Sequence, residues 1–223
     1  MHQVLLNNLQ QTVTEGELQI TSLPLCPRIS LYLLSDHFPK GRLEYEEMMA
    51  IMNAPAYWAF CWASGQVLAS YIINHPREFQ DKQVLDFGSG SGVVAIAACL
   101  AGASRVIACD LDPHALDACR ANAELNNVEF ELLDDVLALE GRVDLIIAAD
   151  VLYDQDNIPW IEKLPSMANH VLIADSRVKT DRLSGYRILD RVTARTIPDL
   201  DEFKEFCDVR IYRKNQPVPL PEP

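Results

Sequence analysis

The middle of the chain, residues 81–175, alternates short apolar runs with segments whose apolar residues recur at helical spacing. Short apolar runs bounded by turn residues are typical of buried strands, and a spacing of three to four residues is typical of helices. The pattern predicts strands at Gln83–Asp86, Arg105–Asp110, Val128–Leu133, Val143–Ala149 and His170–Ala174. It predicts helices between them at Gly92–Ala101, Asp112–Asn126 and Ile158–Leu164. Strands separated by helices imply right-handed crossovers and a parallel sheet covered on both faces.

The pattern is weaker in the flanking segments. Residues 1–40 contain several prolines and are expected to be irregular, with short strand-like pieces such as Glu17–Leu23. Further elements are predicted as helices at Leu43–Met52, Ser64–Asn74 (with Ser64 as N-cap) and Leu183–Asp190, and as strands near Arg191–Thr196 and Cys207–Tyr212. We therefore expect an N-terminal extension over residues 1–54, one domain over 55–215, and a proline-rich disordered tail over 216–223.

Composition agrees with a single folded domain. The chain has 223 residues, of which 49% are hydrophobic and 23% charged. The longest apolar run, Val93–Ala101, is far shorter than the ~18–20 residues that span a bilayer. No secretory signal is visible, and the six cysteines form no C-x-x-C pair or metal-like cluster. These features predict a cytoplasmic protein with reduced thiols, no membrane partner and no metal.

The net charge of −13 is concentrated in the middle of the chain. Residues 81–175 contain five Lys or Arg and seventeen Asp or Glu, a net charge of −12. So acidic a segment repels phosphate backbones and attracts cations, which makes a nucleic-acid partner unlikely. A solvated acidic surface that only aids solubility is the alternative.

A glycine-rich loop, DFGSGSG, follows the first strand of this segment and leads into a helix. Such a loop turns tightly and brings backbone N–H groups against a ligand. The dinucleotide fingerprint G-x-G-x-x-G/A does not fit, because its last position falls on Val93. The G-x-G-x-G spacing of Gly88, Gly90 and Gly92, preceded by Asp86, points instead to an S-adenosylmethionine site, with an ordinary strand-to-helix turn as the alternative.

Acidic residues end the next two strands. Asp110 is expected beside the glycine loop, where its carboxylate can accept both hydroxyls of a ribose. Its alternative role is to cap the following turn, although Asp112 fits that role better. After the third strand, Asp134 or Asp135 can accept from an adenine amino group; we favour Asp135, which directly precedes the apolar pair Val136–Leu137.

Three blocks of the chain resemble a known family. They are PAYWAFCWASGQ at Pro55–Gln66, Val84–Pro113 with DFGSGSG and ACDLDP, and AADVLYD at Ala148–Asp154. With these blocks the chain resembles the class I, seven-strand, S-adenosylmethionine-dependent methyltransferases. Within that class it is similar to the electron-transfer flavoprotein beta-subunit lysine methyltransferases, whose bacterial members are often labelled nicotinamide N-methylase-like.

The resemblance implies an α/β, Rossmann-like fold and a set of site residues. The cofactor-binding residues would be Trp62 over the pocket, Gly88, Ser89 and Gly90 in the loop, Asp110 on the ribose, and Ala149 in the pocket wall. Asp150 and Tyr153 would form the acidic-x-x-aromatic motif at the substrate lysine. The run Ala174–Val178 departs from the family's Gly-Asp-Pro-Gly-Arg-like run, so the protein substrate is left open.

Asp150 and Tyr153 also suit amine methylation on physical grounds. Both follow the fourth strand and face the crevice of Gly88. Methyl transfer from a sulfonium requires a neutral amine lone pair, whereas a free lysine has a pKa of about 10.4. Asp150 would attract the cation, and an aromatic wall would desolvate it and favour proton loss. The alternative is a helix cap for Asp150 and a packed ring for Tyr153.

The leading hypothesis is therefore a protein-lysine methyltransferase, with the electron-transfer flavoprotein beta subunit or another lysine-bearing protein as partner. The alternatives are N-methylation of a nicotinamide-like small molecule and a non-catalytic methyltransferase fold that acts as an interaction module. Methylation of RNA is disfavoured by the charge of −13.

Overall fold

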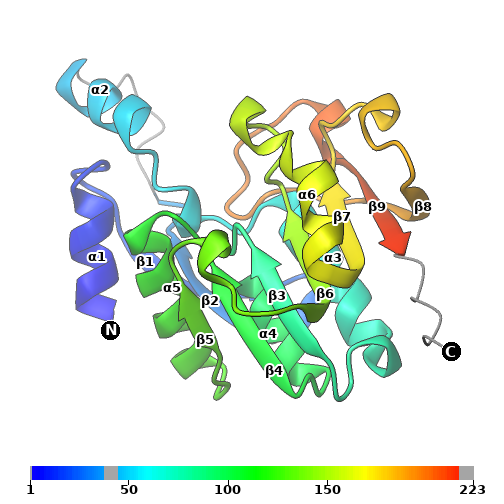
Figure 1. Cartoon of the computed structure of the whole chain (residues 1–223). Coiled ribbons are helices and arrows are strands. Elements are labelled where there is room, and N and C mark those ends of the chain that lie inside the picture. Colours follow the sequence, from blue (N-terminus) through cyan, green and yellow to red (C-terminus); the bar gives the residue numbers. More distant parts are fainter. Residues whose placement is uncertain (1, 38–44, 216–223) are drawn as a thin grey trace, which may run out of the picture.

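The centre of the molecule is a seven-stranded sheet with the strand order β5-β4-β3-β6-β7-β9-β8 (Figure 1). The computed structural model describes residues 2–37 and 45–215. The strands of this sheet are β3 (Gln83–Phe87), β4 (Arg105–Cys109), β5 (Glu131–Leu133), β6 (Val143–Ala149), β7 (Ala168–Asp175), β8 (Arg187–Thr193) and β9 (Asp208–Asn215). The predicted α/β architecture with a mostly parallel sheet is confirmed.

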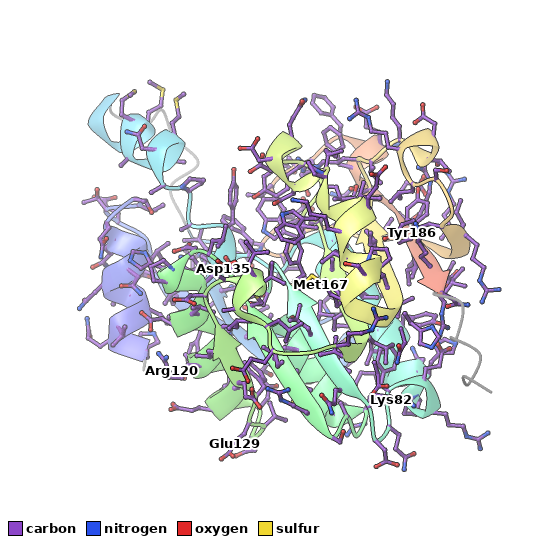
Figure 2. All side chains as sticks on the ribbon, viewed as in Figure 1. Lys82, Arg120, Glu129, Asp135, Met167 and Tyr186 are labelled. Atoms are coloured by element: carbon purple, nitrogen blue, oxygen red, sulfur yellow. The ribbon has the colours of Figure 1, made fainter. Side chains whose placement is uncertain are left out.

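The five strands β3 to β7 are parallel, as the sequence predicts, and β9 pairs antiparallel with both β7 and β8. Figure 2 shows the consequence: Lys82 and Glu129, which precede β3 and β5, lie at one edge of the sheet, and Asp135, which follows β5, lies at the other. Parallel strands thus bring all their following loops to one edge, where open α/β sheets bind ligands.

Helices cover both faces of the sheet. Helices α3 (Ala63–Asn74), α4 (Val93–Leu100) and α5 (Pro113–Leu125) lie on one face and α6 (Trp160–Met167) on the other. Successive strand residues point to opposite faces. Val84 accordingly joins the core beneath α3 and α4, whereas Leu85 joins the core beneath α6.

The N-terminal segment is more regular than the sequence predicts. It forms α1 (His2–Gln10) and an antiparallel hairpin of β1 (Leu18–Leu23) and β2 (Cys26–Leu34). The expectation of irregular structure was wrong because these elements bury single apolar stripes against distant parts of the chain. α1 packs on α5, and Ile29, Leu31 and Leu33 of β2 are fully buried against α3 and α4.

The expected helix at Leu183–Asp190 was also wrong. Gly185 has a φ of +78° and turns the chain, while Leu183 and Tyr186 pack into the core beneath α6. The chain then enters β8, which pairs with β9 (Figure 1). The apolar residues that mimic helical spacing are therefore divided between a turn and a strand.

Other predicted bounds shift by a few residues. Helix α2 spans Tyr45–Asn53, and residues 43–44 and the tail 216–223 of our predictions lie outside the described residues. Ser64 is not an N-cap, because α3 begins at Ala63 with Trp62 before it. Short 3₁₀ turns complete the chain at η1 (Tyr57–Ala59), η2 (Pro76–Glu78), η3 (Val136–Ala138), η4 (Gln155–Asn157), η5 (Thr180–Arg182) and η6 (Lys204–Cys207).

The structure bears on two predictions made from composition, namely reduced thiols and the absence of a membrane-spanning helix in the described residues. All six cysteines are free thiols, and five of them are buried. Among the helices of residues 2–37 and 45–215, none is long and apolar enough to cross a membrane.

The fully buried amide of Asn122 joins three parts of the fold, so its removal tests their interdependence. Its Nδ2 donates to the carbonyl of Ser91 at 2.8 Å, and its Oδ1 accepts from the N–H of Tyr32 at 2.8 Å. Asn122→Ala leaves both backbone groups unpaired and is expected to lower the unfolding free energy by about 2–4 kcal/mol in urea titrations. The exposed Asn74→Ala, whose bonds are local, should change it by less than about 0.5 kcal/mol. Equal effects of the two variants would contradict this account.

Candidate active site

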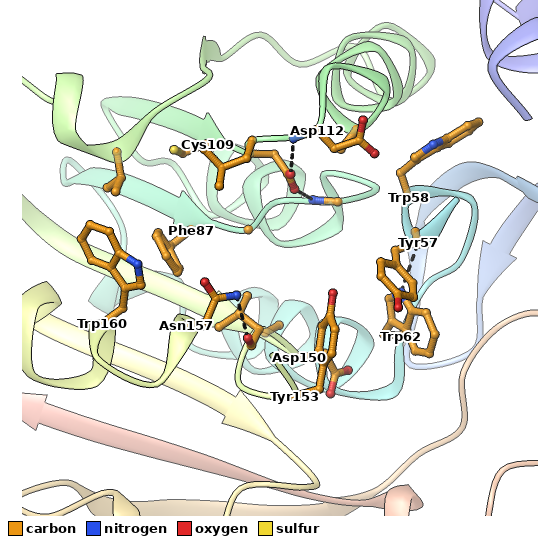
Figure 3. A pocket seen from close by; sticks show the side chains of 18 of the residues that line it. Tyr57, Trp58, Trp62, Phe87, Cys109, Asp112, Asp150, Tyr153, Asn157 and Trp160 are labelled. Carbon is orange, nitrogen blue, oxygen red and sulfur yellow. Dashed lines mark hydrogen bonds between the residues drawn. The ribbon is translucent and has the colours of Figure 1, made fainter. Parts of the chain in front are cut away.

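A cavity of about 240 Å³ opens at the carboxyl edge of the sheet, between the ends of β3, β4 and β6 and the turn η1 (Figure 3). Its floor is formed by Gly88, Gly90 and Asp110. Phe87 and Trp160, whose ring centroids lie 5.4 Å apart, wall one end. Aromatic residues of a different segment wall the other end. The cavity thus has a polar floor between two groups of aromatic rings.

The glycine loop has the backbone conformation that its sequence predicts. Gly88, Gly90 and Gly92 have φ values of +70°, +50° and +78°, in the region that favours glycine. A Cβ on Gly88 would lie 2.5 Å from Cγ1 of Val151, so close packing requires glycine there. A Cβ on Gly90 would meet no atom within 4 Å, and because Gly90 lines the cavity, its backbone is open to a ligand.

Asp110 holds this loop and still faces the cavity. Its Oδ2 accepts from the N–H of Gly90 at 2.8 Å, and its Oδ1 accepts from the N–H of Asp112 at 3.0 Å (Figure 3). A carboxylate offers about four lone-pair sites, so each oxygen can accept one further bond. Burial raises the pKa of Asp110. Asp112, as predicted, caps α5 by accepting from the N–H of His114 at 2.8 Å.

Of the two acidic residues predicted near the adenine, Asp134 and Asp135, only Asp135 lines the cavity. Asp135 lines the cavity and accepts from the N–H of Leu137 at 2.9 Å, which leaves its second oxygen unused by that bond. Asp134 is exposed and lies outside the wall. Ala149 lines the cavity at the end of β6. Leu111, 79% exposed at the rim, is an apolar surface that the sequence analysis did not single out.

Two predicted cofactor contacts are not in the cavity wall, and both expectations need correction. Asp86 is 1% exposed beneath the loop, where its Oδ2 accepts from the N–H of Ala95 at 3.0 Å and holds the start of α4. Ser89 is also buried, and its hydroxyl accepts from Sγ of Cys119 at 3.3 Å on the side of α5. Asp86 is a residue of strand β3, where successive side chains point to opposite faces, so its neighbour Phe87 lines the cavity while Asp86 lies beneath the loop. The Ser89 side chain supports the loop from the side of α5.

Aromatic rings from two segments meet at the opposite end of the cavity. Tyr57 packs edge-to-face on Trp62 and on Tyr153, with centroid distances of 5.7 and 5.4 Å. The indole N–H of Trp62 donates to the carbonyl of Tyr57 at 3.0 Å, which fixes the ring (Figure 3). Trp62 and Tyr153 were predicted at the site, whereas Tyr57 was given no role and only lies within the block Pro55–Gln66. Its partner Tyr153 is 96 residues away in the chain, so the sequence alone carries no signal for the contact.

Asp150 lies beside these rings in an uncommon conformation. Its φ of +53° is rare for a non-glycine residue and turns the chain sharply at the end of β6. Its two oxygens accept from the N–H and the hydroxyl of Ser64 at 2.9 and 2.7 Å. Burial raises the pKa of Asp150 to about 7, and the nearby carboxylate of Asp175 adds to the rise. Asp150 therefore both holds the start of α3 and lines the cavity.

A second, smaller cavity of about 60 Å³ adjoins the first. It is lined by Tyr57, Trp62, Asp150 and Tyr153, which also line the larger cavity, and by Arg177. A carboxylate among aromatic rings suits an alkylammonium group, which gains both a counter-charge and cation–π contacts. The larger cavity, the large compartment, therefore suits a nucleoside. The smaller cavity, the small or amine compartment, suits an alkylammonium group. Sequence reasoning missed Arg177, which lies in the run that departs from the family pattern.

Comparisons with known proteins agree with this site. A model of the ribosomal protein L11 methyltransferase family (PrmA) matches residues 69–158. The human electron transfer flavoprotein beta subunit lysine methyltransferase is 39% identical over 170 residues, which cover 72% of this chain and 64% of the relative. The zebrafish (Danio rerio) protein of that name is 35% identical over 189 residues, covering 81% and 72%.

Solved structures share the fold. A putative RNA methyltransferase from Pyrococcus horikoshii matches with a TM-score of 0.56 and 24% identity, over 69% of this chain and 85% of that one. Magnesium protoporphyrin IX methyltransferase from Synechocystis PCC 6803, solved with bound S-adenosylmethionine, matches with a TM-score of 0.54 and 18% identity, over 79% and 86%.

The sheet, the glycine loop and the acidic strand ends define a class I methyltransferase fold. The segment that the family model matches, residues 69–158, includes the glycine loop and the turn at Asp150. The chain belongs to the family of the electron transfer flavoprotein beta subunit lysine methyltransferases, which confirms the resemblance seen in its motifs. Its matches span 64% and 56% of the lengths of the human and mouse members.

The burial of Asp86 predicts a distinctive pH dependence of stability. Desolvation is the largest cause that raises its pKa from 3.8 to about 7. As pH rises from 4 to 7, the unfolded chain ionises while the folded chain keeps the proton, so stability falls with pH. Asp86→Asn retains an acceptor for Ala95 without this loss. Between pH 5.5 and 8, the wild type should lose about 2 kcal/mol relative to Asp86→Asn in urea unfolding.

The exposed Asp134→Asn serves as the control for this measurement. Its unfolding free energy should follow that of the wild type across the same pH range. A curve for Asp86→Asn that is parallel to the wild-type curve would show that the folded state does not retain the Asp86 proton.

Proposed function

We propose that this protein is an S-adenosylmethionine-dependent methyltransferase that modifies lysine side chains of a protein substrate. The observation that carries this proposal is the pair of adjoining cavities, which share the wall formed by Tyr57, Trp62, Asp150 and Tyr153. A methyl donor in the large compartment and an amine in the small one would meet at that shared wall.

The large compartment fits the cofactor. Backbone of Gly90 is open to the cavity, the oxygens of Asp110 can each accept one ribose hydroxyl, and Asp135 can accept from the adenine amino group. Apolar surface for the base is provided by Leu111 and Val136. S-adenosylmethionine supplies an electrophilic methyl carbon. The chain's own contribution is to bind, orient and exclude water.

The small compartment fits a lysine ε-amine. Transfer forms an N–C bond and breaks the C–S bond, whose electron pair stays on sulfur, so an amine lone pair must be aimed in line at the methyl carbon. Asp150 binds and orients the incoming ammonium, and burial beside Tyr57 and Tyr153 removes water from it, which favours proton loss to solvent. Correct orientation of the amine contributes much of the rate of methyl transfer, because misorientation alone can lower that rate about 100-fold.

The protein substrate is proposed from the family. Relatives that share 35–39% identity carry the name electron transfer flavoprotein beta subunit lysine methyltransferase. We propose that subunit as the first acceptor to test. We also propose a cytoplasmic location, which the six free cysteines support. We further propose that residues 55–215 form the catalytic domain and that residues 1–54 are an N-terminal extension.

The cofactor assignment predicts the effect of Asp110→Ala. This change removes two charge-assisted bonds to the ribose, and each such bond contributes about 1.5–3 kcal/mol, so S-adenosylmethionine affinity should fall tenfold or more. Isothermal titration calorimetry measures it. Asp134→Ala, an acid outside the cavity wall, should keep wild-type affinity. Equal affinity in Asp110→Ala and wild type would refute the assignment.

The acceptor assignment predicts the effect of Asp150→Asn. The variant keeps an acceptor for Ser64, so its fold and cofactor affinity should remain, but the ammonium loses its counter-charge. We expect turnover to fall about 100-fold, measured as methyl transfer at saturating cofactor. Asp154→Asn, four residues on, is the matched control and should remain active, because Asp154 lines neither cavity and its side chain accepts from the N–H of Asp156. Comparable loss in both variants would argue against a specific role for Asp150.

The function itself is tested by product identification. The enzyme is incubated with tritiated S-adenosylmethionine in a cell lysate, and the labelled species is separated, treated with protease and analysed by mass spectrometry. Methyl-lysine in a protein is the expected result. A labelled small molecule, a nucleotide, or a different amino acid would overturn the lysine assignment, and a labelled nicotinamide-like amine would support the small-molecule alternative.

A further inference from the structure

The turn after β7 places a cation at the amine compartment. The Asp175 carboxylate accepts from the N–H groups of Arg177 and Val178, both at 2.7 Å, and thereby closes a tight turn at the end of the strand. Asp175 is 1% exposed, so this turn is anchored in the core. Arg177, the second residue after Asp175, forms part of the wall of the small cavity.

Two contacts hold the Arg177 guanidinium in place. Its Nη2 donates to Oε1 of Glu202 at 2.7 Å, and its Cζ lies 4.5 Å from the ring centroid of Phe206. The Arg177 side chain is 36% exposed and that of Glu202 only 13%. A guanidinium has five N–H donors, so one that packs on a ring and pairs through a single N–H group still has donors for other partners. Arg177 also lines the amine compartment, and its charge acts on Asp150 across it by lowering the pKa of that carboxyl.

We propose that Arg177 is an electrostatic residue of the methyl-transfer site, which faces the bound lysine amine and favours its neutral form. The inference rests on the proposed function and deepens it. The charged and titratable groups that line the same compartment are Asp150 at the end of β6, Tyr153 in the loop that follows and Tyr57 in η1. The buried Asp175 at the end of β7 also interacts electrostatically with Arg177 and with Asp150. Glu202 forms an ion pair with Arg177 but does not line the compartment.

The need for such a cation follows from the opposing demands on the amine. Asp150 attracts the ammonium, but a carboxylate also stabilises the charged form and holds the amine pKa up. Transfer requires the lone pair, and therefore proton loss to solvent before the N–C bond forms and the C–S bond breaks. A fixed positive charge lowers the amine pKa again. Asp150 would then recruit and orient the amine, while Arg177 opposes its protonation.

The charge can be removed without removing the side chain's bulk. We would compare Arg177→Gln, which is neutral, with Arg177→Lys, which keeps the charge, by measuring kcat against pH on the protein acceptor that the wild type labels. The pKa seen in kcat reports the enzyme–substrate complex. In Arg177→Gln this pKa should rise by about one pH unit, a modest shift suited to a partly exposed charge, so kcat falls about tenfold near pH 7.5 and recovers at high pH. Arg177→Lys should keep the wild-type profile.

Two controls separate the amine from other groups. An acceptor in which the target lysine is replaced by S-aminoethylcysteine has an amine of lower pKa, so the alkaline shift belongs to the amine only if the profile moves to lower pH with this acceptor. Glu202→Gln releases the ion pair of Arg177 while keeping its charge. It should leave the profile unchanged or move it to lower pH, in the direction opposite to Arg177→Gln.

Each outcome distinguishes the two proposals. If the wild type transfers no methyl group to lysine, the proposed function fails, and this inference fails with it. If the wild type is active and Arg177→Gln loses kcat equally at all pH values, Arg177 is only structural and this inference alone is overturned. It is overturned in the same way if Glu202→Gln shows the alkaline shift of Arg177→Gln, because anchoring of the loop would then explain both.

Discussion

Carboxylates that accept backbone N–H groups at the ends of adjacent strands are the constraint on which the site depends. Asp86, Asp110, Asp150 and Asp175 belong to β3, β4, β6 and β7 or directly follow them, and these strands are neighbours in the sheet. Each binds N–H groups of a different loop or helix start. Burial raises the pKa of all four carboxyl groups. Holding these loops therefore costs the folded state the free energy of desolvating four carboxylates.

The four carboxylates divide structural and chemical roles. Asp86 and Asp175 are almost fully buried and act on the backbone, the first under the glycine loop and the second beneath the Arg177 turn. Asp110 and Asp150 hold backbone groups too, yet also line the cavities. A charged ligand can therefore interact only with groups whose geometry is already fixed. Such preorganisation suits a reaction that requires alignment more than acid–base chemistry.

Sequence reasoning identified the cavity-lining residues whose position depends on local order. The glycine loop, Asp110, Asp135 and the Asp150–Tyr153 pair all follow strands that periodicity identifies, and parallel strands must bring their ends together. It could not tell that Asp86 points beneath the loop, because one residue of register along a strand reverses the direction of a side chain.

The remaining misses depend on long-range packing. Helix α1 and the β1–β2 hairpin are stabilised by contacts with α3, α4 and α5, which local patterns do not reveal. The contact between Ser64 and Asp150 joins residues 86 positions apart, and that between Arg177 and Glu202 joins a turn to a later loop. Gly185 divides an apparently helical pattern in two. These features appear only once the tertiary structure exists.

The proposed function requires that the methyl donor and the amine occupy adjoining compartments and meet where both compartments are lined by Tyr57, Trp62, Asp150 and Tyr153. A crystal structure of the protein with S-adenosylhomocysteine tests it most directly. The account predicts ribose hydroxyls within hydrogen-bonding distance of both Asp110 oxygens, and the sulfur directed toward the compartment of Asp150, Tyr153 and Arg177. A ligand bound elsewhere, or a sulfur directed away from that compartment, would contradict it.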